Sequence, residues 1–127
     1  ELVKVETDLI ANGYVVDIPV SAKTMKAKND FVVEHFKGAT TSAQKGLYIK
    51  ENFDNIASSD AILVINNEKD GIQGYVGPNV LMEIGLAYHL GIKIFVWNQY
   101  PTDAPYKDEL LALNVQVINQ DLSQIHV

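Results

Sequence analysis

Residues 60–98, "DAILVINNEKDGIQGYVGPNVLMEIGLAYHLGIKIFVWN", decide the fold. The stretch begins and ends with continuous apolar runs, at 60–66 and 92–98, of the kind that form strands buried on both faces. Between them, a loop rich in turn-forming residues (67–77) leads into a helix expected over 79–90. A strand, a helix and a second strand in this order indicate two parallel strands joined by a helical crossover.

The rest of the chain continues this alternation. Further strands are expected at 14–19 and 115–119, and further helices at 2–12, 45–58 and 105–113. Residues 21–44 follow no clear pattern and are interpreted as a long surface excursion, a candidate lid. We therefore expect one α/β domain over residues 1–127, three-layered and flavodoxin-like, in which a parallel sheet carries helices on both faces.

Composition excludes several classes of function. The 127 residues are 47% apolar and 20% charged, as in an ordinary globular protein, and ten lysines, no arginine and 16 acidic residues give a net charge of −6. No positive field of the kind that nucleic acid requires is present. No apolar run approaches the roughly 20 residues that span a bilayer, and nothing at the N-terminus resembles a signal peptide. We expect a cytoplasmic protein with neither nucleic acid nor membrane as a partner.

Metal and thiol chemistry are also not indicated. The chain has no cysteine, which excludes disulfides, thiol nucleophiles and thiolate metal sites. Its histidines, including His35 and His89, do not stand at the spacing of metal ligands. The sequence therefore predicts no metal site and no cofactor.

One acidic residue, Glu83, stands among the apolar positions of the helix at 79–90. Ligands of parallel sheets bind at the carboxyl ends of the strands, which is where this helix begins. We expect Asn79 to be the N-cap, so that Glu83 lies about one turn into the helix, where the peptide dipoles favour a negative charge. Glu83 and Asn79 project from the same side and form a candidate nucleophile or hydroxyl-binding pair. The alternative is that Glu83 only complements the helix dipole or caps a neighbouring loop.

The motif around Glu83 resembles a known family. It reads Glu, then Ile or Leu, Gly, a nearby Ala, and a Gly and a Lys just before a strand; the residues here are Glu83, Ile84, Gly85, Ala87, Gly91 and Lys93. Together with the order of elements from residue 59 to residue 125, this motif is similar to the nucleoside 2-deoxyribosyltransferase-like superfamily, above all to its small, mostly uncharacterised archaeal and bacterial members. The glutamate is the nucleophile in that family, a role that the resemblance implies for Glu83.

The resemblance implies an N-glycosyl-bond enzyme, transferase or hydrolase, that acts on nucleosides or nucleotides. The alternative is a non-catalytic module of the same fold that binds a nucleotide or a nucleoside derivative. Active relatives carry an aspartate about eight residues before the aspartate that opens the central strand, which corresponds to Asp60 here. The candidates for it in this sequence are Asn52, which is not a carboxylate, and Asp54, which lies two positions away. The candidate substrate-binding residues at the sheet edge are Asn66, Tyr75, Gly77 and Asn79, with Tyr75 either a base-stacking group or a turn residue.

The resemblance also bears on the sheet edge and on assembly. Family members begin with a strand and a small-residue loop, whereas this sequence opens in the helix expected at 2–12. We therefore expect the first strand to be absent and a partner chain or a further segment to fill the gap beside 14–19 and 60–66.

A neighbouring subunit closes the site in the resembled enzymes, and a homodimer or higher homo-oligomer is expected here as well. The apolar stripe of the helix at 79–90 is wider than one sheet face needs, because of Leu86, Tyr88 and Leu90. The expected contact pairs this helix and the helix at 45–58, with its Tyr48 and Phe53, across a twofold axis.

Overall fold

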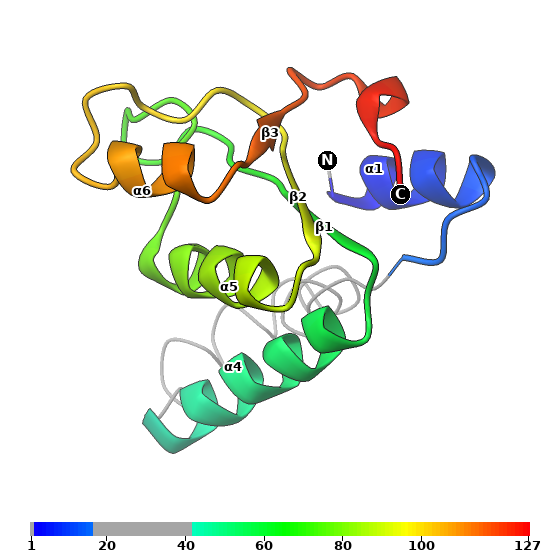
Figure 1. The fold of residues 1–127 in the computed structure, drawn as a ribbon, viewed down its shortest axis with the longest axis horizontal. Coiled ribbons are helices and arrows are strands. Elements are labelled where there is room, and N and C mark those ends of the chain that lie inside the picture. The colour runs from blue at the N-terminus through cyan, green and yellow to red at the C-terminus, as the bar shows by residue number, and fades with distance from the viewer. Residues whose placement is uncertain (1, 17–41) are drawn as a thin grey trace. The chain divides into compact units, whose positions relative to one another are not determined.

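The computed structural model describes residues 2–16 and 42–127. The chain divides into two units, Glu1–Asn55 and Ile56–Val127, and each is described by itself. The first holds α1 (Leu2–Ala11) and most of α4 (Ser42–Ala57). The second holds β1 (Ala61–Val64), α5 (Pro78–His89), β2 (Lys93–Val96), α6 (Lys107–Ala112), β3 (Gln116–Val117) and the 3-10 helix η1 (Leu122–Gln124) (Figure 1).

The strands of the second unit form an open, three-stranded parallel sheet in the order β1-β2-β3. Val96 in the middle strand pairs with Val64 of β1 and with Val117 of β3. Each connection steps to the next strand in the same direction, and right-handed crossovers of this kind place both connecting helices on one face. Figure 1 shows α5 and α6 on the same side of the sheet. The α/β class and the parallel pairing of the strands expected at 60–66, 92–98 and 115–119 are confirmed.

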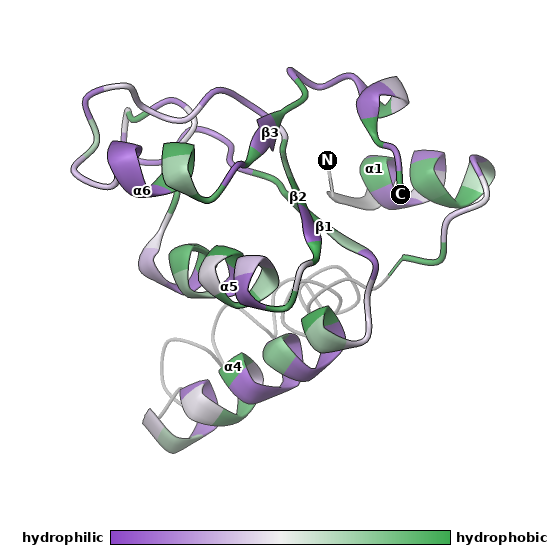
Figure 2. Ribbon diagram, in the orientation of Figure 1, coloured by the Kyte–Doolittle hydropathy of each residue, from purple (hydrophilic) through white to green (hydrophobic). Residues whose placement is uncertain are grey.

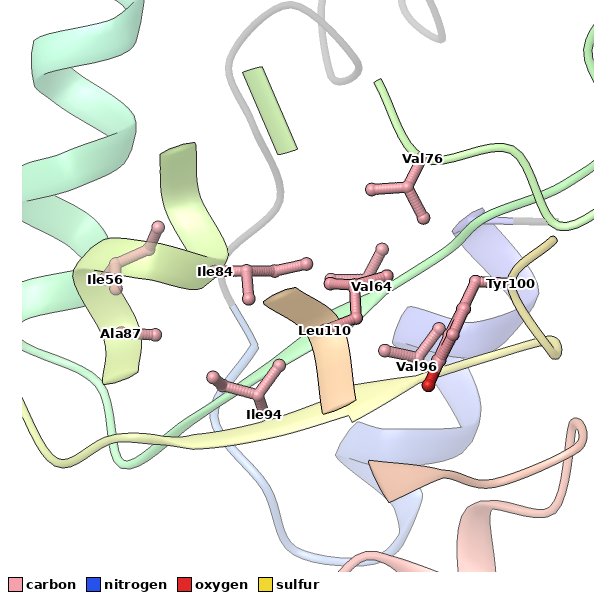
Figure 3. Close-up of a cluster of buried hydrophobic side chains, with 9 residues drawn as sticks. All are labelled: Ile56, Val64, Val76, Ile84, Ala87, Ile94, Val96, Tyr100 and Leu110. Carbon is pink, nitrogen blue, oxygen red and sulfur yellow. The ribbon is translucent and has the colours of Figure 1, made fainter. Parts of the chain in front are cut away.

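The core of this unit lies between the sheet and these two helices. Alternate strand residues, among them Val64, Ile94 and Val96, face α5 and α6, as the two-residue period of a strand requires. The cluster, drawn in Figure 3, consists of Ile56, Val64, Val76, Ile84, Ala87, Ile94, Val96, Tyr100 and Leu110. In Figure 2, α5 and α6 each carry hydrophilic as well as hydrophobic residues, because only one face of each helix is needed for this core.

Glycines end two of the expected helices. Gly13, after α1, and Gly91, after α5, adopt positive φ angles of 91° and 73°, which cost glycine nothing. The Ile92 N–H then donates to the Ala87 carbonyl at 2.8 Å and satisfies one of the last carbonyl groups of α5. The helices expected at 2–12 and 79–90 are confirmed.

Two expectations for the first half of the chain need correction. Helix α4 is described from Ser42 rather than from residue 45, because Ala43 and Gln44 are good helix formers. Residues 14–16 lie in no strand, and Val15 is 98% exposed. Residue types that favour strands are not enough by themselves, because a strand forms only when it pairs with another. The rest of the strand expected at 14–19, and residues 17–41 with most of the expected excursion and His35, lie outside the described residues.

The adjacent leucines of α6 provide a matched test of the core. Leu110 is fully buried in the cluster, whereas its neighbour Leu111 is 62% exposed. Leu110→Ala is expected to lower the free energy of unfolding by about 3 kcal/mol, since it removes buried methyl groups and leaves a cavity. Leu111→Ala should change it by less than about 0.5 kcal/mol. Urea unfolding followed by circular dichroism measures both, and equal effects would mean that α6 does not pack as described.

Candidate functional site

The candidate site is built on the loop between β1 and α5, which opens with a tight turn. Lys69 and Ile72 exchange two backbone hydrogen bonds, of 3.1 and 2.9 Å. Asp70 and Gly71 between them have φ angles of 52° and 82°, the pair of positive values that a type I′ turn requires. This turn lies in the loop at 67–77, which the sequence shows to be rich in turn-forming residues.

Asn66, just beyond β1, is a buried polar residue with 2% exposure. Its Nδ2 donates to the Gly74 carbonyl at 3.1 Å and to the Asn98 carbonyl at 2.8 Å, while its Oδ1 accepts from the Asn98 N–H at 2.8 Å. The two Nδ2 hydrogens are thus engaged within the protein. Asn66 joins the loop to the end of β2, and its contact with a substrate stays a prediction.

Tyr75 and Gly77 lie together at the end of this loop. A Cβ on Gly77 would lie 3.3 Å from Cε1 of Tyr75, so the tyrosine ring rests close to the glycine backbone. The Lys69 ammonium lies 5.2 Å from the centroid of the same half-buried ring, within the range of a cation–π contact. An aromatic ring and a lysine therefore stand beside the start of α5, and base stacking on Tyr75 stays a prediction.

The start of α5 differs from the expectation. Its N-cap is Gly77, with Pro78 at the first helical position and no side-chain hydrogen bond to the cap. Asn79 as N-cap is wrong, because Pro78 has a φ already suited to the first helical position and needs no N–H partner there. Glu83 is consequently the sixth residue of α5, and no acidic residue lies in the first turn. The dipole attraction fades beyond that turn, so it does not account for this carboxylate.

The helix brings Glu83 and Asn79 to one side, four residues apart. Asn79 is exposed and Glu83 is half-buried, directly before the fully buried Ile84. Glu83 therefore lies on the border between the apolar core and solvent, where a carboxylate is partly shielded from water. The motif residue Gly85 has no packing role in the described structure, because a Cβ on it would meet no atom within 4 Å.

Asn52 and Asp54, the other predicted catalytic residues, lie on α4 in the first unit. Asn52 is half-buried and Asp54 is exposed. The Asp54 carboxylate forms an ion pair with Lys50 at 3.0 Å, between side chains one helical turn apart. Glu83 lies in the second unit, and the two units are described separately. A shared site of Asn52 or Asp54 with Glu83 therefore stays a prediction.

Two further residues shape the loop: Gly74, a turn-forming residue in the sequence, and Asn98, which sequence reasoning missed. Gly74 has a φ of 70°, and a Cβ there would collide with the carbonyl oxygen of Gln99. Asn98 is the partner of Asn66. A signal for the second was present, because the apolar runs 60–66 and 92–98 both end in asparagine.

Comparisons with known proteins add no assignment: no family model matches the chain, and neither does any curated protein or solved structure. Within residues 2–16 and 42–127, no group of three or more histidine, aspartate or glutamate side chains is arranged to hold a metal ion. No helix in the described part of the chain is long and apolar enough to cross a membrane.

The two positive-φ glycines of the loop provide a matched pair of variants. Gly74→Ala combines an unfavourable φ with a collision against Gln99, and is expected to lower the free energy of unfolding by about 3 kcal/mol. Gly71→Ala has the same kind of φ but open space around its Cβ, so a loss of about 1 kcal/mol is expected. Urea unfolding compares them, and a Gly74 variant as stable as the Gly71 variant would contradict the described loop packing.

Proposed function

We propose that the protein breaks the N-glycosidic bond of nucleosides or nucleotides with Glu83 as the nucleophile. The observation that carries this proposal is the half-buried position of Glu83 on α5, on the same side as Asn79. Support comes also from the resemblance of the motif around Glu83 to the nucleoside 2-deoxyribosyltransferase-like superfamily, where the corresponding glutamate attacks the sugar. The loop with Tyr75 and Gly77 leads directly into this helix.

The chemistry requires a carboxylate beside C1′ of the sugar. The Glu83 carboxylate attacks C1′ as the bond from C1′ to the base nitrogen breaks, and the electron pair of that bond leaves with the base, which takes a proton from solvent. A second base, or water, then attacks C1′ from the opposite face, releases the carboxylate and gives its proton to solvent. The sugar keeps its original configuration, because two displacements take place.

The other site residues have supporting roles in this proposal. The Tyr75 ring stacks on the base, and Asn79 with the backbone of Gly77 binds the sugar. Asn66 holds the loop and contributes to the same edge, through the hydrogen bonds to Gly74 and Asn98. Asn52 or Asp54 would orient the substrate or the attacking group.

The proposal extends to the fold, a three-layer, flavodoxin-like domain with helices on both faces of the sheet. Phe95 and Trp97 occupy alternate positions to Val96, on the face opposite α5 and α6, and both are buried. A sheet that is apolar on both faces needs a covering layer on each.

A second candidate is a non-catalytic module that binds a nucleotide or a nucleoside derivative at the same edge. Asn52 favours it, because an amide cannot act as a carboxylate. So does Asp54, whose carboxylate is exposed and paired with Lys50. This candidate predicts the same ligands as the enzyme, but no turnover.

Substitution of Glu83 tests catalysis. Incubation with 2′-deoxyadenosine and free cytosine, followed by chromatography of the products, should show glycosyl exchange or hydrolysis in the wild type. Glu83→Gln keeps the shape but removes the nucleophile, and should lower the rate on the order of 10⁴-fold. The control Glu109→Gln makes the same charge change at an exposed position on α6 and should leave the rate unchanged.

Two results would reject the enzymatic proposal. The first is turnover that Glu83→Gln does not reduce, which would exclude this residue as the nucleophile. The second is binding of deoxynucleosides or deoxynucleotides, measured by calorimetry, with no turnover of any of them. That result would establish the binding module instead.

The assembly proposed with this function is a homodimer that uses the outer face of α5. Met82 within α5, Tyr88 near its end and Leu90 just after it are 46%, 53% and 45% exposed, so large apolar groups remain on the surface. Leu86, expected in the same contact, packs partly against the core and is a poor probe of an interface. Tyr48 and Phe53 on α4 are half-buried.

A charge on this face tests the dimer. Tyr88→Glu should convert a dimer to a monomer at micromolar concentration, because the interface would have to bury an unpaired carboxylate. Leu111→Glu, at an exposed position on α6, is the matched control and should remain dimeric. Size-exclusion chromatography with light scattering measures both, and a dimeric Tyr88→Glu protein would show that the interface lies elsewhere.

A further inference from the structure

Beyond the ends of β1 and β2, side chains continue the hydrogen bonding of the sheet. The last backbone bond between these strands runs from the Trp97 N–H to the Val64 carbonyl, at 2.9 Å. Past it, the Asn66 side chain binds both the N–H and the carbonyl of Asn98, each at 2.8 Å. The Asn98 side chain returns the contact, because its Nδ2 donates to the Asn66 carbonyl at 3.1 Å. The side chain of each asparagine is therefore hydrogen-bonded to the backbone of the other.

Asn98 is itself oriented by the segment after β3. Its Oδ1 accepts a 2.8 Å hydrogen bond from Nε2 of Gln120, whose backbone N–H donates to the Trp97 carbonyl at 2.9 Å. Asn119 and Gln120 have φ angles of 50° and 64°, which are uncommon for residues other than glycine. Such backbone strain persists where surrounding contacts hold the geometry in place. The Asn98 side chain is therefore fixed from both sides.

The same series of side-chain hydrogen bonds reaches the loop of the candidate site. Asn66 Nδ2 uses its second hydrogen for the Gly74 carbonyl, at 3.1 Å, and Gly74 lies next to Tyr75. Any change that lets the Asn66 side chain move also releases Gly74. The contacts then form one path from Gln120 through Asn98 and Asn66 to the loop.

We propose that Asn98 is a positioning residue, which acts through Asn66 to set the conformation of residues 67–77 and hence the places of Tyr75 and Gly77 beside α5. The ligand part of this inference rests on the proposed function, for which Tyr75 and Gly77 bind the substrate. The loop-setting part rests on the hydrogen bonds alone. Asn98 makes no contact with substrate in this account.

The variant Asn98→Asp tests the contribution of the Asn98 side chain separately from that of its backbone. It keeps the backbone groups that bind Asn66 and an oxygen that can accept from Gln120, but replaces the donor facing the Asn66 carbonyl with an acceptor. The control Asn114→Asp makes the same charge change at an exposed turn residue whose φ of 56° aspartate tolerates. Two measurements follow the effect: hydrogen exchange of the Asn66 side-chain amide by NMR, and calorimetric binding of 2′-deoxyadenosine.

In Asn98→Asp, the Asn66 side-chain amide should exchange about tenfold faster and the resonances of residues 67–77 should shift. The reason is the loss of the hydrogen bond from the Asn98 side chain to the Asn66 carbonyl. Affinity for 2′-deoxyadenosine should fall about tenfold for the same reason. Asn114→Asp should match the wild type in both measurements. If Asn98→Asp does not fold, Gln120→Met serves instead, since it removes the donor to Asn98 at an exposed position, and the same changes are expected.

The two measurements separate the inference from the function. A wild type that binds no 2′-deoxyadenosine would count against the proposed function, while the NMR exchange would still decide whether Asn98 sets the loop. Unchanged Asn66 exchange and unchanged loop resonances in the folded variant would overturn the inference. Faster Asn66 exchange with wild-type affinity would overturn the ligand part of the inference, because a merely structural tie would change the exchange and spare the affinity.

Discussion

A buried amide without hydrogen-bond partners is costly, and the arrangement at the carboxyl edge of this sheet follows from how Asn66 meets that constraint. Its side chain binds Gly74 in the next loop and both backbone groups of Asn98 after β2. These contacts fix how β1 and β2 end, and where the loop turns back toward α5. They also account for the glycine at position 74, where the loop approaches Gln99 too closely for a side chain.

The core determines the remaining part of the site, the placement of α5. Ile84 and Ala87 are fully buried against the sheet, and this fixes how α5 is rotated about its axis. Glu83 precedes Ile84, so the same rotation places its carboxylate at the edge of the core, half-buried and on the side of Asn79. The position of the proposed nucleophile is therefore a consequence of packing, while the loop that is proposed to bind a substrate depends on the Asn66 hydrogen bonds.

Features set by neighbouring residues were predictable from the sequence. The apolar runs at 60–66 and 92–98 form β1 and β2, and the turn-rich loop at 67–77 contains a tight turn at Asp70-Gly71, because a few adjacent residues determine each. The start of α5 was misplaced, since Pro78 outweighs the capping preference of Asn79. The partners of Asn66 lie 8 and 32 residues away, so the residues adjacent to Asn66 do not identify them. The sequence therefore indicates Asn66 as a polar residue at the sheet edge, but not the hydrogen bonds that it makes within the protein.

Trapping the covalent intermediate tests whether Glu83 attacks the sugar. The protein is mixed with 2′-deoxyadenosine, quenched in acid during turnover, digested with trypsin and analysed by tandem mass spectrometry. The account predicts a deoxyribosyl group on Glu83, within the peptide that follows Lys69 and ends at Lys93, and none there in Glu83→Gln. A deoxyribosyl group on a different residue, or turnover in which the sugar inverts its configuration, would contradict it.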